Sequence, residues 1–81
     1  MKEPIEVGFQ AFVVDGGDEF GAIREVSTDG RMLTVYVENA GDFQVPMSAV
    51  ASVHFQKVIF HAGKLDPALR RAIGHAHDSE V

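Results

Sequence analysis

The feature that most constrains the fold of this chain is a series of short runs in which apolar residues occupy every second position. The clearest run, residues 33–38, alternates Leu, Val and Val with Thr, Tyr and Glu, and residues 7–13 begin the same way. This is the period of a β-strand with one buried face. Gly- and Asp-rich stretches at 15–18, 27–30 and 39–42 separate the runs, and these residue types favour turns. The pattern therefore predicts short strands joined by tight turns.

The chain is predicted to form a single domain, residues 1–81, of the mainly β class. Five or six short strands joined by tight turns are typical of a small antiparallel β-barrel, which we place at residues 6–61. Pro46 cannot donate a hydrogen bond to a ladder, so it should end one strand. Residues 47–50 are then expected to form one helical turn before the last strands.

The second strand is expected to contain an irregularity. Phe20, Ile23 and Val26 follow one another at spacings of three, and strict alternation would place them on opposite faces of the sheet. One extra residue, inserted as a β-bulge, would return them to the same face. We therefore predict a bulge near Gly21.

The C-terminal part of the chain changes to a helical period. Apolar residues at 69, 72, 73 and 76 share one face of a helix,. Asp66 is a favourable N-cap residue, and Pro67 is favourable at the first helical position. These features predict one C-terminal α-helix over residues 66–77, followed by a tail at 78–81.

Composition narrows the classes of function. The chain has no cysteine, which excludes disulfides and thiolate metal sites. Its N-terminus has no signal-peptide pattern and no apolar run could cross a bilayer, so a cytoplasmic location without membrane insertion is expected. A net charge of −5 repels nucleic-acid phosphates, so we expect no nucleic-acid binding. The basic residues Lys64, Arg70 and Arg71 are interpreted as a solvated helix face.

Residues 16–20 read GGDEF, which is identical to the signature of diguanylate cyclases. That resemblance implies glycines that approach a guanine nucleotide and acids that serve metal and catalysis. Such chemistry also needs a metal-binding aspartate on an earlier strand, whereas the strand before the string reads EVGFQAFVV. We interpret the string as a turn between two strands and assign no catalytic residue, with a nucleotide cyclase as the third-ranked alternative.

The histidines suggest a further alternative. His61, His75 and His77 could supply ligands to a zinc ion. On a helix, positions i and i+2 point about 200° apart, so His75 and His77 cannot share a metal while the helix is intact. We interpret them as surface residues near a helix C-terminus, where imidazolium is favourable, and expect no metal and no other cofactor. A small ligand- or metal-binding protein that uses this segment is the second-ranked function.

The aromatic residues point to an interface. Six Phe and one Tyr are a large aromatic content for a small barrel, and Phe12, Tyr36 and Phe55 are candidates for its outer surface. Exposed apolar patches mark interaction sites, and a symmetric homodimer is the commonest way to bury one. We expect a homodimer, while the alternative that every aromatic fits the core or lies under the helix stays open.

Three stretches together resemble the PRC-barrel family of small β-barrels: VVDGGDEFGAIREV, FQVPMSAVASV and KVIF. The matching features are an apolar residue followed by glycine, here Phe20 and Gly21, and a Val-Pro-apolar run that begins at Val45. The family includes the cytoplasmic domain of the photosynthetic reaction-centre H subunit and the C-terminal domain of a ribosome maturation factor. The resemblance covers residues 7–61 and implies no catalytic residue. It implies a non-enzymatic protein-interaction or adaptor module, and the sequence identifies no protein partner other than a second copy.

Overall fold

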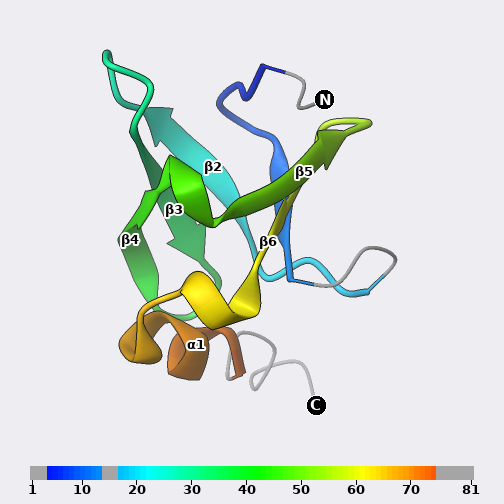
Figure 1. The fold of residues 1–81 in the computed structure, drawn as a ribbon. Coiled ribbons are helices and arrows are strands. Elements are labelled where there is room, and N and C mark those ends of the chain that lie inside the picture. Colours follow the sequence, from blue (N-terminus) through cyan, green and yellow to red (C-terminus); the bar gives the residue numbers. More distant parts are fainter. Residues whose placement is uncertain (1–3, 14–16, 75–81) are drawn as a thin grey trace.

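The computed structural model describes residues 4–13 and 17–74. Within these residues, one sheet of six strands curls into a half-barrel that is followed by one α-helix (Figure 1). The predicted class, mainly β with one C-terminal helix, is confirmed. In chain order, the elements are β1 (Gln10–Phe12), β2 (Gly21–Val26), β3 (Met32–Val37), β4 (Gly41–Pro46), the 3-10 turn η1 (Met47–Ala49), β5 (Val50–His54), β6 (Lys57–Phe60), the 3-10 turn η2 (Ala62–Lys64) and α1 (Pro67–Gly74).

The sheet is mixed, with the strand order β4-β3-β2-β1-β6-β5. Strands β1 to β4 form an antiparallel meander, and β5 and β6 form an antiparallel hairpin. The hairpin joins the meander through β1 and β6, which are parallel. The prediction of an antiparallel barrel is therefore corrected at this one pair.

The chain direction at η1 explains the parallel pair. Pro46 ends β4 as predicted, and the expected helical turn is present as η1. This turn does not reverse the chain, so β5 runs in the same direction as β4 on the opposite edge of the sheet. Because β6 is antiparallel to β5, it runs parallel to β1.

The concave side of the curled sheet encloses the hydrophobic core. In β3, the side chains of Leu33, Val35 and Val37 are completely buried, as the alternation predicts. Phe20 and Phe60 pack in the same core with ring centroids 6.1 Å apart. The core also includes Val45 of β4 and Val53 of β5, so it unites residues from both edges of the sheet.

The predicted bulge is present in β2, but it lies at Arg24, between Ile23 and Glu25. Gly21 itself pairs regularly with Val37. A Cβ atom at Gly21 would overlap the carbonyl oxygen of Tyr36. Gly21 therefore marks a close approach of two backbones and not the bulge. Since a strand glycine is common at both kinds of position, the bulge was predicted at the wrong residue.

Helix α1 lies across one end of the half-barrel (Figure 1). The Ala68 N–H donates to the Asp66 carboxylate over 3.1 Å, which confirms Asp66 as the N-cap residue. Leu69 is 2% exposed and joins the core. The last predicted helical residues, 75–77, and the tail lie outside the described residues. In the part of the chain that the structure describes, no helix has the length and apolarity needed to cross a membrane.

Asp29 organises the turn between β2 and β3. Its carboxylate accepts hydrogen bonds from the Ser27 hydroxyl at 2.7 Å and from the Arg31 N–H at 3.0 Å. The Ser27 bond, and then the Arg31 bond, lower the pKa of the Asp29 carboxyl below its ordinary value of 3.8. The Ser27 hydroxyl oxygen also accepts from the Met32 N–H at 3.0 Å, which ties the turn to the start of β3.

Asp29→Asn should lower the thermal stability of the domain at neutral pH and remove part of its pH dependence. Because the pKa of Asp29 is lowered in the folded state, its carboxylate stabilises the fold above the unfolded-state pKa. This contribution is lost as the pH falls through the folded-state pKa. The difference between the thermal melts of both proteins should therefore begin to shrink as the pH falls below about 4 and disappear below the folded-state pKa. A melting difference that stays constant into strong acid would contradict the role of this carboxylate.

Candidate functional site

The GGDEF string lies in the connection between the antiparallel strands β1 and β2, as predicted. Its first residue, Gly16, is outside the described residues. Asp18 is exposed, whereas Phe20 is 3% exposed and belongs to the core. The Phe20 N–H donates to the Ala11 carbonyl at 2.9 Å, and its own carbonyl accepts from the Glu38 N–H at 3.1 Å. The last residue of the string is therefore part of the barrel framework.

The histidines considered as zinc ligands are only partly placed by the structure. His61 is exposed at the start of η2, where its N–H donates to the Ala49 carbonyl at 2.8 Å. His75 and His77 lie outside the described residues. Among the residues that are described, no three His, Cys, Asp or Glu side chains gather closely enough to hold a metal ion. The second-ranked alternative, a site that combines His61 with the other two, is therefore not tested by the described residues.

The three aromatic residues predicted for the outer surface differ in exposure. The prediction is wrong for Phe12, which is 6% exposed. Phe12 pairs with Ile59 across the parallel β1–β6 pair. The Lys57 ammonium group lies 5.6 Å from the centre of the Phe12 ring. Tyr36 is 36% exposed and Phe55 is 85% exposed, so these two lie outside as predicted.

Phe55 occupies the tip of the β5–β6 hairpin in a strained backbone conformation. Phe55 and Gln56 have φ angles of 52° and 63°, and they connect His54 and Lys57, which are paired. Two-residue hairpin turns with positive φ at both positions strongly favour Asn-Gly, since a bulky side chain is disfavoured there. The Gln10 N–H donates to the Gln56 carbonyl at 3.0 Å, which holds the tip against the start of β1. The tip therefore presents an exposed aromatic ring on a backbone that is held against β1.

The strain at the tip predicts that Gln56→Gly stabilises the domain. Glycine adopts positive φ without steric cost, so the unfolding free energy should rise by about 1 kcal/mol, and Tm by about 4–8 °C. Urea denaturation followed by circular dichroism measures the change. The same replacement at Gln44, in β4, should be destabilising because strand glycines lose more entropy. A Gln56→Gly protein less stable than the native one would show that the turn is not strained.

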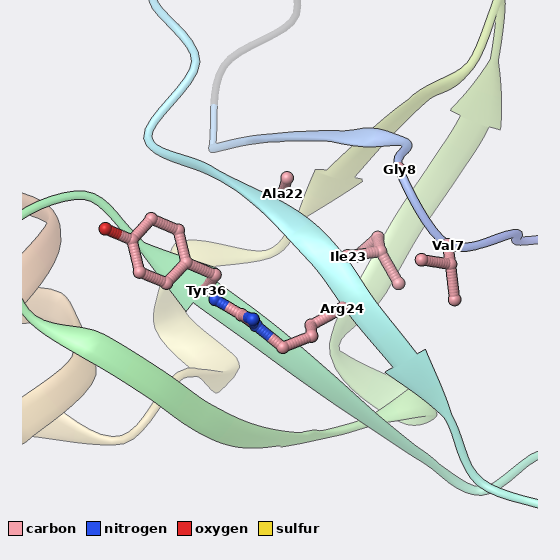
Figure 2. A pocket seen from close by; sticks show the side chains of 6 residues that line it. All are labelled: Val7, Gly8, Ala22, Ile23, Arg24 and Tyr36. Carbon is pink, nitrogen blue, oxygen red and sulfur yellow. The ribbon is translucent and has the colours of Figure 1, made fainter.

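A shallow pocket of about 210 Å³ lies on the outer face of β2 and β3 (Figure 2). The N-terminal segment forms one wall, because the Gly8 N–H donates to the Ile23 carbonyl and the Ile23 N–H donates to the Phe9 carbonyl, each at 2.8 Å. This volume is below the range of about 300–1,000 Å³ that is usual for small-molecule sites. The pocket is lined by Val7, Gly8, Ala22, Ile23, Arg24 and Tyr36.

The charged group in this pocket has its partners within the chain. The Arg24 guanidinium lies over the Tyr36 ring, 5.1 Å from its centre, and its Nε is 3.0 Å from an Asp42 carboxylate oxygen. The ion pair is exposed, so it contributes little to stability, but it balances the positive charge of Arg24. The pocket thus offers an apolar floor beside an aromatic ring.

The sequence predicted Tyr36 as a surface residue but missed the pocket around it. Val7, Ala22 and Arg24 come from two other segments, and the register that pairs Ala22 with Tyr36 brings them together. The available signal was the alternation of β3, which directs Tyr36 outward.

Comparisons with known proteins add no assignment to this site. No family model matches the chain, and neither the curated proteins nor the solved structures give a match. A function is therefore inferred from the geometry of the surface, in which the hairpin tip and the pocket are the two distinctive features.

Proposed function

We propose that this domain is a non-enzymatic, cytoplasmic protein-interaction module of the PRC-barrel type, which acts as an adaptor and self-associates. The observation that carries the proposal is Phe55, which is 85% exposed at a hairpin tip with φ of 52°. Aromatic residues are enriched at protein interfaces. A strained conformation persists at a cost in stability and is common at functional positions. Phe55 combines both properties.

The two edges of the sheet favour an approach from the side of this hairpin. The edge strand β4 contains Asp42 and ends at Pro46, and a charge and a proline both discourage pairing with another chain. The edge strand β5 contains no acid, lysine, arginine or proline. The feature of β5 that discourages pairing with another chain is a bulge between Val50 and Ser52. A partner that contacts Phe55 therefore meets the less protected edge.

The proposal assigns no catalysis to the GGDEF string. The burial of Phe20 in the core gives a packing reason for the last residue of the string. We expect purified protein, incubated with GTP and magnesium, to form no cyclic dinucleotide. Measurable turnover that disappears in the Glu19→Ala variant would contradict the proposal.

The adaptor role is tested by affinity capture with three baits: the native domain, Phe55→Asn and Gln56→Gly. Each tagged bait is expressed with an untagged native copy in the source organism. The native and Gln56→Gly baits should retain untagged copies or one stoichiometric protein, because both keep the aromatic ring. Phe55→Asn removes the ring and suits positive φ, so it should stay folded and retain much less protein than the native bait. Equal retention by all three baits, or none by the native bait, would contradict the proposal.

A further inference from the structure

We propose that self-association rests on one reciprocal contact, in which Phe55 of each copy inserts into the pocket between Val7, Ala22 and Tyr36 of the other copy. This inference rests on the proposed function and identifies both the partner, a second copy of this chain, and the site. Among the described residues, Phe55 is the most exposed large apolar side chain. The contact places it in an apolar pocket of the other copy.

Shape and chemistry match in this contact. The pocket of about 210 Å³ is open, apolar and below the usual size of a ligand site, so it suits a single side chain,. Figure 2 shows the Tyr36 ring at one end of the pocket and Val7 at the other, with Ala22 and Ile23 between them. A phenyl ring seated there would pack against an aromatic ring that already carries the Arg24 guanidinium, and such aromatic contacts are favourable beyond their buried area.

The charges around the two features are complementary. Phe55 lies in a stretch, residues 43–65, that contains Lys57 and Lys64 and no Asp or Glu. Two exposed acids, Glu6 and Glu25, adjoin the lining residues Val7 and Arg24 in the sequence. Asp42 balances the charge of Arg24. A hairpin that contains Lys57 and no acid therefore meets a pocket whose lining residues have two acids next to them in the sequence, which favours this orientation over others.

The positions of the two features allow the contact to be reciprocal. The pocket is on β2 and β3, the tip joins β5 and β6, and β1 alone separates β2 from β6 in the sheet. The Gln10–Gln56 hydrogen bond fixes the tip beside β1. In Figure 1, the tip and the N-terminal segment lie at the same end of the half-barrel, away from α1. Two copies related by a twofold axis can therefore exchange their tips and close as a dimer.

Sedimentation equilibrium of the native protein, Phe55→Asn and Ala22→Lys tests the contact. Phe55→Asn removes the ring, and Ala22→Lys fills the pocket with a long, charged side chain. Each variant should dimerise at least about thirtyfold more weakly than the native protein, as for a typical hot-spot residue. Gln56→Gly keeps the ring and should dimerise like the native protein. Should Ala22→Lys melt at a lower temperature, Val7→Lys, on an exposed segment, takes its place.

Mixing the two variants gives the sharper result. Phe55→Asn keeps an intact pocket and Ala22→Lys keeps an intact Phe55, so a heterodimer retains one of the two contacts. The mixture should associate more tightly than either variant alone. If the native protein forms a dimer and Phe55→Asn dimerises equally well, this contact is overturned but self-association is not. A native protein that is monomeric at every concentration would overturn both.

Discussion

Replacing Gly21 by alanine is expected to remove a large part of the stability of this domain. Gly21 is buried in β2, paired with Val37 of β3 and with Ala11 of β1. A Cβ atom at this position would overlap the Tyr36 carbonyl oxygen. Since that oxygen belongs to the backbone of a paired strand, it can only move if the β2–β3 ladder opens. We expect a loss of about 3 kcal/mol or more, against a total stability of about 4–12 kcal/mol for a chain of this length.

Urea denaturation of Gly21→Ala and Gly63→Ala separates this overlap from a general effect of removing glycine. Gly63 is exposed in η2, and a Cβ atom there would meet no other atom within 4 Å. Gly63→Ala should therefore change the unfolding free energy by less than about 0.5 kcal/mol. Similar midpoints for the two variants would show that the β2–β3 approach is not as close as the structure has it.

Phe20→Ala should have the second large effect, a loss of about 3–5 kcal/mol. Phe20 is 3% exposed and its ring lies 6.1 Å from that of Phe60, centre to centre. Truncation removes this contact and leaves a cavity between β6 and the residue that immediately precedes β2. The core at this end of the half-barrel is then expected to become loosely packed.

Asp18→Ala provides the matched control within the same GGDEF string. Asp18 is exposed, so its truncation should stay within about 0.5 kcal/mol of the native protein. Thermal and urea denaturation of both variants measure the contrast. If Asp18→Ala cost as much as Phe20→Ala, the string would have a structural role beyond a turn and one core residue.

The features that sequence predicted well are local ones. The alternation of residues 33–38 placed Leu33, Val35 and Val37 in the core, and the structure buries all three completely. Asp66 and Pro67 marked the start of α1 because capping depends on neighbouring residues alone,.

The features that sequence missed depend on long-range pairing. The parallel β1–β6 pair follows from the direction of the chain after η1, which hydrophobic alternation does not encode. This pair also buries Phe12 beside Ile59 and so reverses its expected exposure. The bulge at Arg24 was expected near Gly21, because a strand glycine signals either a bulge or a close backbone approach,.

The candidate site divides in the same way. The aromatic content named Phe55 as one of three candidates for the outer surface, and Phe55 is exposed, but the same argument also named Phe12, which is buried,. The positive φ of Phe55 could not be predicted, because Phe-Gln is not a residue pair that favours a two-residue hairpin turn,. The pocket could not be predicted from the sequence, because Val7, Ala22 and Tyr36 come from three segments that only the sheet register brings together.

The most direct test of the central claim, that this domain is a self-associating interaction module, is the mass of the native protein in solution. Sedimentation equilibrium over low- to high-micromolar concentrations should show a monomer that converts to a dimer and to nothing larger, because a reciprocal contact closes on itself. A monomer mass at every concentration would contradict the claim.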